Sequence, residues 1–523
     1  MRIEKVNNLP SYMNVTSKKI NGVVYTPKWI VDLILDNIEY KNNIYDKKII
    51  DPSCGEGNFL VVAVERFLKD CIENNLSLDE IKKALHNNIF GFDIDKNSII
   101  KCKTYLNDVI QKYGIDKIEW NIIQMDSLDK NNVKQYFNIF DYVIGNPPYI
   151  RIQHLGKDRR ERIQRDWSFC RSGSTDMYIS FFELGFNLLN ETGKLGYITP
   201  NTYFKTETAK ALRYYLMEKK IIKKIIDFNH HQVFDDATTY SAITILDKSW
   251  RQNKFYYYKG YDKGIKYVDE IELSNIDYNK WTIASNTDLK RIKEIETRGI
   301  PLGKLTKIHV GITTLADDFY IFKDPIIEND KATIKLKDGR VFTIEKDILK
   351  PIVKVSILKS SNDEQNRWII FPYKKINGKY TIIPEGELKD LYPYTYKYFL
   401  AIKDRLLLRD KGKKNPVAWY AFGRSQGLDN TWGKKILVSP LSLYPNFIVW
   451  EKEEYTFYAG YCIKFDGDLQ WLSKQLNSED MEFYIKHVGR DYQNGYKSYA
   501  KSFIYNFGIV EYKNEEYDNL TLF

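Results

Sequence analysis

Cysteine is scarce in this sequence, and the few cysteines lie far apart. There is no Cys-x-x-C pair and no cluster of cysteine with histidine among Cys54, Cys71, Cys102, Cys170 and Cys462. This pattern argues against a zinc site and against a disulfide framework, and it is typical of proteins in a reducing compartment.

Long apolar runs are missing as well. No stretch approaches the ~20 apolar residues that cross a bilayer. The first residues, MRIEKVNNLPSYMNVTSKK, lack the apolar core of a signal peptide. We therefore expect a soluble, cytoplasmic protein with no membrane partner and no metal site.

The chain is rich in aromatic and basic residues. Its 523 residues favour roughly two to four domains, and 43% hydrophobic residues suffice for large cores. Lys and Arg number 79 against 69 Asp and Glu, a net charge of +10 that suits a polyanion, although a basic soluble enzyme would have the same charge. The 40 tyrosines suit base stacking, although an AT-rich genome would also produce such a composition.

Residues 20–250 alternate between β-rich runs and helical patterns such as 59–73. The expected strands are 47–53, 88–95, 118–126, 140–148, 194–200, 221–228 and 238–247. This alternation predicts an α/β fold whose Rossmann-like sheet is mainly parallel and covered on both faces. Because no long helical pattern separates the last two runs, we expect them to form a terminal antiparallel pair. Binding sites in such sheets lie at the carboxyl ends of the strands.

Beyond residue 250 the alternation gives way to short aromatic and charged segments and turn-rich stretches. We expect an α+β second domain whose detailed fold cannot be read from the sequence. The expected domains are an N-terminal extension at 1–20, an α/β domain at 21–250, a linker region at 251–290 and an α+β domain at 291–523.

A glycine-rich turn follows the first expected strand. The segment 51–59, DPSCGEGNF, leaves a strand and enters a helix. Gly55 and Gly57 permit backbone conformations closed to other residues and let a ligand approach closely, and the helix start offers free N–H groups. The alternative is a tight turn without a ligand.

Acidic residues end the next two expected strands. Asp93 can accept both hydroxyls of a ribose, whereas Asp95 is better explained as a helix cap. Asp126 can accept the amino group of an adenine. Because the chain has no phosphate-binding G-x-G-x-x-G, a nucleoside-type cofactor is favoured over NAD, and S-adenosyl-L-methionine is the natural choice.

The most specific motif is Asn146-Pro147-Pro148-Tyr149, directly after the fourth expected strand. Two prolines stiffen the backbone and hold the Asn146 side chain in place. The Asn146 amide oxygen and the Pro147 carbonyl can each accept one N–H of a target amine, which frees the nitrogen lone pair for in-line attack on a sulfonium methyl. Tyr149 can stack on the target base. A structural turn is the alternative.

These motifs resemble those of the gamma class of N6-adenine DNA methyltransferases of bacterial restriction–modification systems, and they occur in the order that the class uses. The resemblance covers most of the chain and implies a site-specific enzyme with a C-terminal target-recognition domain. It implies that the segment at Tyr25 and Thr26 lies at the methionine end of the cofactor, and that Ile94 and Phe181 pack on the cofactor adenine. It also implies that Phe234 stacks on the target adenine opposite Tyr149, although core packing is an equal alternative for both phenylalanines.

The candidate catalytic residues are Asn146, Pro147 and Tyr149. The candidate cofactor-binding residues lie in the segments described above: Tyr25, Thr26, Asp51, Ser53, Cys54, Gly55, Gly57, Asp93, Ile94, Asp126, Ser127, Asn146, Pro148 and Phe181. The implied partners are double-stranded DNA with a specific short sequence and a cognate restriction endonuclease acting on the same site. We expect the protein to be a monomer.

Methylation of N6 inside a duplex requires extrusion of the adenine. Residues 151–171 carry seven Lys or Arg against three acids, which suits phosphate contacts beside the pocket and equally suits a solvated helix. In the second half, 309–318 resembles the start of recognition domains in this class. The side chains of Arg424 and Gln426 suit base edges, although a structural turn is also open. The candidate DNA-binding residues are Arg151, Lys157, Arg159, Arg160, Arg424, Gln426, Lys497 and Lys501.

Other activities share parts of this pattern. Methyltransferases of RNA guanine amines and of protein glutamine amides use the same tetrapeptide, but they do not need roughly 270 further basic and aromatic residues. A non-catalytic DNA-recognition subunit would not need intact motifs. Cytosine-N4 transfer usually uses Ser-Pro-Pro, and cytosine-C5 transfer needs a Pro-Cys pair, which is absent. A fused nuclease is less favoured, because we see no room before residue 20 and no nuclease motif elsewhere.

Overall fold

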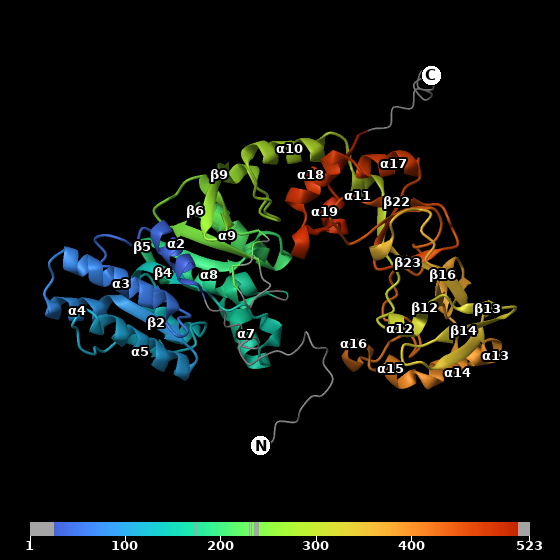
Figure 1. The fold of residues 1–523 in the computed structure, drawn as a ribbon, viewed down its shortest axis with the longest axis horizontal. Helices are drawn as coiled ribbons and strands as arrows, with labels where there is room; N and C mark the ends of the chain where they lie inside the picture. Colours follow the sequence, from blue (N-terminus) through green and yellow to red (C-terminus); the bar gives the residue numbers. More distant parts are fainter. Residues whose placement is uncertain are drawn as a thin grey trace, which may run out of the picture. The chain divides into compact units, whose positions relative to one another are not determined.

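The computed structural model describes residues 26–510 except 172, 174, 230, 232 and 235–239. The chain divides into two compact units, Met1–Leu289 and Lys290–Phe523. In Figure 1 the first unit runs from blue to green and the second from yellow to red. Each unit has its own sheets and its own buried core.

The described part of the first unit is built on one nine-stranded sheet with the order β3-β2-β1-β4-β5-β7-β6-β8-β9. Its strands are β1 (Ile49–Asp51), β2 (Ile89–Asp93), β3 (Asn121–Gln124), β4 (Phe140–Gly145), β5 (Leu189–Pro200), β6 (Ile222–Asp227), β7 (Ser241–Asp247), β8 (Lys254–Tyr261) and β9 (Gly264–Glu272). Strands β3, β2, β1, β4 and β5 are mutually parallel. The predicted mainly parallel sheet is confirmed.

The far side of the sheet agrees with the expected antiparallel pairing but not with the expected terminal position of the pair. β6 and β7 do pair antiparallel, but β7 lies between β5 and β6 and is antiparallel to both. The pair is not terminal, because β8 runs parallel to β6 and pairs antiparallel with β9. Both of these strands lie in the expected linker region 251–290. Tyrosine side chains are half apolar and half polar, so the KFYYYKGY run of β8 does not show the alternation that predicts a strand.

Helices cover both faces of this sheet. They are α2 (Lys28–Asn37), α3 (Asn58–Glu73), α4 (Leu78–Asn88), α5 (Lys96–Gln111), α7 (Lys157–Asp166), α8 (Met177–Leu188) and α9 (Lys210–Lys219). Neighbouring residues of β5 point to opposite faces. A Cβ atom at Gly196 would meet Ile34 of α2, whereas the ring of Tyr197 packs on Phe182 of α8. Helices α2 and α8 therefore lie on opposite faces, as doubly wound sheets require.

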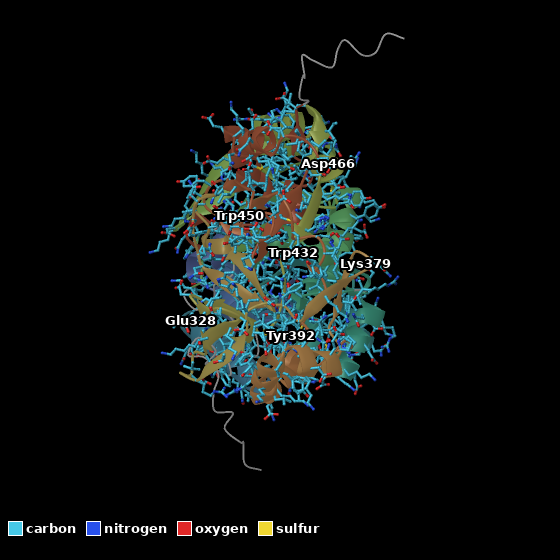
Figure 2. The ribbon with its side chains drawn as sticks, turned by 90° about the vertical axis from the view of Figure 1, so that its right-hand side faces the viewer. Glu328, Lys379, Tyr392, Trp432, Trp450 and Asp466 are labelled. Carbon is cyan, nitrogen blue, oxygen red and sulfur yellow. The ribbon has the colours of Figure 1, made fainter. Side chains whose placement is uncertain are left out.

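The second unit mixes short sheets with helices, which confirms the α+β prediction. One sheet has the order β11-β24-β20-β22 and another β12-β17-β16-β23. The strands are β11 (Lys307–Val310), β12 (Ile321–Lys323), β16 (Leu349–Lys354), β17 (Arg367–Ile370), β20 (Lys435–Val438), β22 (Phe447–Trp450), β23 (Thr456–Tyr458) and β24 (Tyr461–Lys464), and the longer helices are α13 (Glu385–Leu391), α14 (Pro393–Ala401), α17 (Leu469–Leu476) and α18 (Glu479–Val488). Trp432 and Trp450, labelled in Figure 2, belong to two separate apolar clusters of this unit.

Several expected absences can be examined in the described residues. All five cysteines lie in this part of the chain, where each is buried and none forms a disulfide. No group of three or more His, Cys, Asp or Glu residues within it is placed to hold a metal ion. Nor does this part of the chain contain a helix with the length and apolar character needed to cross a membrane.

Candidate cofactor and catalytic site

The expected site residues follow the carboxyl ends of four neighbouring strands. β1 pairs in parallel with β2 and β4, and β2 pairs in parallel with β3. Asp51 ends β1, Asp93 ends β2, Asp126 follows β3 and Asn146 follows β4. Because parallel strands end at the same edge, these side chains lie along one edge of the sheet, where doubly wound folds place their ligands.

The glycine-rich turn is held by Asp93 from the next strand. The Gly55 backbone N–H donates to Asp93 Oδ2 at 2.9 Å, and Gly55 has a positive φ of 51°. Gly57, the N-cap of α3, has a φ of 96°, and a Cβ atom there would lie 2.7 Å from Cys102 Sγ. Positive φ favours glycine at both positions, and at Gly57 the closeness of Cys102 also excludes a side chain. Nothing lies within 4 Å of a Cβ atom built on Gly55, which leaves open space beside the turn.

Asp51 is a buried carboxyl group at the start of this turn. Its Oδ1 accepts the Ser53 backbone N–H at 2.9 Å, and its exposed fraction is 1%. Burial raises the pKa of Asp51 to about 8, with a smaller contribution from the neighbouring Asp93 carboxylate. A buried carboxyl of this kind favours a positively charged partner, because a cation would stabilise its ionised form.

Gly145, directly before the catalytic motif, is needed for the approach of Asp51. It has a φ of 148°, and a Cβ atom there would lie 2.7 Å from Asp51 Oδ1. The sequence motif begins one residue later, so sequence reasoning missed this position. The signal that could have found it is a glycine that ends a buried strand, which often marks a close approach of backbone and side chain.

We expect Gly145→Ala to lower the free energy of unfolding by roughly 2–4 kcal/mol, from strain at positive φ together with overpacking against Asp51. Gly156→Ala is the matched control, because Gly156 has a φ of −56° and no atom lies within 4 Å of its added Cβ. Chemical denaturation of both variants measures the difference. Equal stability of the two variants would contradict the close packing at Gly145.

The amide of Asn146 is oriented by Thr26. The Asn146 Nδ2 donates to Thr26 Oγ1 at 3.1 Å, and Thr26 is buried just before α2. The nitrogen end of the amide faces Thr26, so its oxygen end is directed away from Thr26. Pro147 is buried and Pro148 half-buried, which keeps the backbone of the motif rigid. Tyr25, the other residue expected from this N-terminal segment, lies outside the described residues.

Three aromatic rings meet at the end of the catalytic motif. The ring of Tyr149 lies edge-on to Tyr178 at 6.3 Å and to Phe234 at 6.5 Å between centroids, with interplanar angles of 77° and 67°. The structure thus brings Tyr149 and Phe234 together as expected, but the two rings are not parallel. A base sandwiched between them would require one ring to rotate. Burial raises the pKa of the Tyr149 hydroxyl well above its usual value, so this group stays neutral.

The chain after the catalytic motif is tied to the start of α8. The Met177 N–H donates to the Ile150 carbonyl at 2.7 Å, and the Ile152 N–H donates to the Thr175 carbonyl at 2.9 Å. Phe181, expected against the cofactor adenine, is buried on α8. These hydrogen bonds show that residues 175–177 fix the backbone that follows Tyr149.

Asp126, the acid expected to take the amino group of an adenine, contacts two arginines of α7. Arg162 Nη2 donates to its Oδ2 at 2.9 Å, and Arg159 Nη2 donates to its Oδ1 at 3.2 Å. Arg159 was expected to contact DNA phosphates, whereas the structure directs its guanidinium to this carboxylate. Arg162 was not singled out from the sequence, although its spacing of three residues from Arg159 places both on one helix face.

The remaining cofactor candidates differ in exposure. Ser127 is buried, and its hydroxyl donates to the Pro52 carbonyl at 2.6 Å, which joins the turn after β3 to the turn after β1. Cys54 is buried, and its N–H donates to the Phe92 carbonyl at 2.9 Å. Ile94 is 52% exposed. An exposed isoleucine beside the Asp93 carboxylate offers an apolar surface to a ligand at the strand ends.

In the second unit, the expected base-reading residues lie on an exposed turn. Arg424 Nη1 donates to Asp410 Oδ2 at 3.1 Å, and Gln426 Nε2 donates to Thr313 Oγ1 at 3.3 Å. Arg424 also lines a pocket together with Lys413, Lys414 and Trp419. The turn therefore joins the 313–314 stretch to a basic pocket.

The two lysines expected near the C-terminus have different surroundings. Lys497 Nζ is paired with the Asp491 carboxylate, and its side chain is only 19% exposed. Lys501 is exposed at the start of α19 (Lys501–Ile504). Lys501 is accordingly better placed than Lys497 to contact a polyanion.

Comparison with known proteins shows which proteins this chain resembles. Residues 87–234, which contain β2, β3, β4 and the Asn146 motif, match the family described as Eco57I restriction-modification methylase. The type II restriction enzyme and methyltransferase RM.Eco57I of Escherichia coli is 29% identical over 80% of this chain. The chain is related to the type II restriction-modification methyltransferases.

Other relatives match over more of their own length. The chain spans 49% of the Escherichia coli protein, but 74% of the type II methyltransferase M.BstVI of Geobacillus stearothermophilus and 86% of M.BanIII of Aneurinibacillus aneurinilyticus, each 27% identical to it. The match to M.BanIII covers 92% of this chain, so the similarity extends through both units.

A solved structure bears out the fold. The structure of the type IIL restriction-modification enzyme MmeI in complex with DNA covers 92% of this chain and 64% of that chain, with a TM-score of 0.59 and 14% identity. The likeness confirms the predicted fold class, a Rossmann-like methyltransferase sheet followed by an α+β region.

Proposed function

We propose that this chain transfers a methyl group from S-adenosyl-L-methionine to N6 of an adenine within a short sequence of double-stranded DNA. The observation that carries the proposal is the Asn146 amide. It is oriented by Thr26 at the carboxyl end of β4, next to the turn that Asp51 and Gly55 shape. Relatives named as type II methyltransferases support the same reaction class.

The residues present fit the proposed cofactor. Its ribose hydroxyls suit the Asp93 carboxylate, its adenine suits the exposed face of Ile94 and the Asp126 carboxylate, and its ammonium suits the buried Asp51 carboxyl. The open space beside Gly55 leaves room for a ligand at the turn. The bound cofactor would supply a methyl group activated by a positively charged sulfur.

The chain's own residues would prepare the target nitrogen. The exocyclic nitrogen of adenine is nearly planar because its lone pair is delocalised into the ring. The Asn146 amide oxygen and the Pro147 carbonyl each accept one N–H, which favours a tetrahedral nitrogen and localises its lone pair for in-line attack. The attacking nitrogen would form the new N–C bond while the bond between the methyl carbon and the sulfur breaks and S-adenosyl-L-homocysteine is released as the leaving group. The nitrogen would then lose one proton to solvent. No covalent enzyme intermediate is required.

A duplex adenine must leave the base stack to reach this site. Tyr149 would stack on the extruded base, with Phe234 on the other side after its ring or that of Tyr149 rotates from the edge-on arrangement. The cost of unstacking, about a few kcal/mol, is offset by these ring contacts. Exposed basic residues after the motif, Arg151 and Lys157, would hold the flanking phosphates.

The second unit would choose the sequence. Arg424 and Gln426 lie on an exposed turn and present the donors and acceptors that read guanine and adenine edges. Their pairing with Asp410 and Thr313 would be exchanged for contacts with bases. A cognate endonuclease acting on the same site, a monomeric state and a cytoplasmic location remain predictions.

We expect cofactor affinity to rise with pH until about pH 8. Because burial raises the pKa of Asp51 to about 8, the free protein carries a proton there at lower pH. A bound ammonium favours the ionised form, so binding below pH 8 releases this proton, and the affinity gains up to about tenfold per pH unit. Calorimetry of cofactor binding in buffers of different ionisation enthalpy gives the number of protons released on binding.

Asp51→Asn serves as the control for this pH dependence, because the amide keeps the shape and cannot titrate. S-adenosyl-L-methionine contains an ammonium that titrates as well, so the meaningful quantity is the difference between wild type and variant. The same proton release from both proteins would remove Asp51 from the ammonium site.

The proposed function is tested by methylating a randomised duplex library with the purified protein and sequencing single molecules with detection of modified bases. The expected result is N6-methyladenine at one fixed position of one short motif. Methylation of adenines in unrelated sequences would contradict the recognition role of the second unit. A protein that binds the cofactor but methylates no DNA would contradict the proposal itself.

A further inference from the structure

Asp126 is held on two sides by side chains from outside its own loop. Its Oδ2 accepts Arg162 Nη2 at 2.9 Å, and its Oδ1 accepts Arg159 Nη2 at 3.2 Å and the Leu128 backbone N–H at 3.1 Å. Arg159 Nε also lies 3.2 Å from Oδ2 as an ion pair. The Asp126 side chain is only 17% exposed, so these contacts are partly shielded from water.

Helix α7 is fixed against the same loop by contacts that do not involve Asp126. The indole of Trp167, which is fully buried at the end of α7, donates to the Leu128 carbonyl at 2.9 Å. Lys130 Nζ donates to the Asp166 carbonyl at 3.1 Å. Arg162 Nη1 lies 3.7 Å from Asp129 Oδ2. The arginines are therefore presented by a helix that is anchored to the loop they contact.

The acceptor positions of Asp126 can be counted. A carboxylate offers about four lone-pair positions, two on each oxygen. Oδ1 has two hydrogen-bond donors, Leu128 and Arg159, whereas Oδ2 has one, Arg162. Arg159 Nε lies 3.2 Å from Oδ2 but makes no hydrogen bond, so Oδ2 keeps one acceptor position for a ligand, and the guanidinium groups fix the direction of this position.

We propose that Arg159 and Arg162 are positioning residues that make Asp126 select a 6-aminopurine as the cofactor base. A guanidinium group can only donate hydrogen bonds, so Asp126 between two of them acts only as an acceptor. Such a carboxylate attracts the N–H of a 6-amino group and repels a 6-oxo group. The inference rests on the proposed cofactor, and it assigns both arginines to cofactor selection instead of phosphate contact.

Other arginines of α7 lack this geometry. Arg165 is paired with the adjacent Asp166 at 2.8 Å and its side chain is 70% exposed. It therefore provides a control with the same charge on the same helix. Arg162→Lys is the conservative variant, because an ammonium still donates but cannot form the planar fork of a guanidinium.

The test measures dissociation constants by calorimetry for two ligands, S-adenosyl-L-homocysteine and its 6-oxo analogue S-inosyl-L-homocysteine. The proteins are wild type, Arg159→Ala, Arg162→Ala, Arg162→Lys and Arg165→Ala, each checked for folding by thermal unfolding. Wild type should prefer the 6-amino ligand, and this preference should fall roughly tenfold in Arg162→Ala, the order expected for a charged hydrogen bond. Arg162→Lys should keep part of the preference, and Arg165→Ala should keep all of it.

A merely structural role would weaken both ligands equally, and that result would overturn the inference. The inference would also be overturned if the arginine variants kept the ligand preference of wild type but bound DNA more weakly. That result would assign the arginines to phosphate contacts. If Arg162→Ala does not fold, the ligand preferences of Arg159→Ala and Arg162→Lys are compared with that of wild type instead. Failure of wild type to bind S-adenosyl-L-homocysteine would instead contradict the proposed function, so the two failures are distinguishable.

Discussion

Asn146→Ala is expected to lower the rate of methyl transfer by about 10²–10³-fold while cofactor and DNA affinities stay within a few fold of wild type. The target amine loses an acceptor that acts most strongly in the transition state, and losses of about 10²–10³ are usual for one preorganised hydrogen-bonding group. Single-turnover kinetics with saturating DNA separates this effect from binding. Near-normal turnover in the variant would remove Asn146 from the reaction.

Thr26→Val provides a graded companion to this variant. Valine keeps the volume of threonine but removes the acceptor of the Asn146 Nδ2 hydrogen bond, which measures 3.1 Å. The amide can then turn, so we expect a smaller loss of about tenfold, the equivalent of one hydrogen bond. In the Asn146→Ala background the Thr26→Val substitution should have little further effect. Independent, additive losses would show that Thr26 does not act through Asn146.

DNA affinity is expected to fall by roughly 10³–10⁵ between about 50 and 200 mM salt. The net charge of +10 and the exposed basic residues suit contacts with several phosphates, and each contact releases condensed counterions. Fluorescence anisotropy with a labelled duplex over this salt range gives the slope. An affinity that does not change with salt would contradict the nucleic-acid partner.

Two lysines provide a matched comparison for the same measurement. Lys157 is 76% exposed at the start of α7, whereas Lys497 is 19% exposed and paired with Asp491. Lys157→Ala should lower the slope of the log–log plot by about one and weaken all sequences alike. Lys497→Ala should leave the slope unchanged. A lower slope in Lys497→Ala and an unchanged slope in Lys157→Ala would instead assign the phosphate contact to Lys497, which is also a candidate from the sequence.

The cofactor turn and the catalytic strand were predictable because their geometry is set locally. Glycines at 55 and 57 are needed for positive φ, and two prolines fix the backbone after Asn146 whatever surrounds them. Asp93 lies where the carboxyl ends of the parallel strands meet, and this position follows from the alternation of strands and helices alone. Each of these features lies within a few residues of its own signal.

Contacts between distant segments could not be read in this way. The bond from Asn146 to Thr26 joins residues 120 positions apart, and the bond from Arg162 to Asp126 crosses 36 positions. Neither leaves a local pattern, because an arginine on a polar helix face is equally suited to water, phosphate or carboxylate. The strand β8 was missed for a different reason, since its tyrosines obscure the alternation of apolar and polar positions.

The central claim, methylation of adenine at N6, is tested most directly by identifying the product. The purified protein is incubated with duplex DNA and S-adenosyl-L-methionine carrying an isotopically labelled methyl group, and the DNA is digested to nucleosides for mass spectrometry. The account predicts labelled N6-methyl-2′-deoxyadenosine as the product, formed far more slowly by Asn146→Ala. Labelled N4-methyl-2′-deoxycytidine, or no labelled nucleoside from a protein that binds the cofactor, would contradict it.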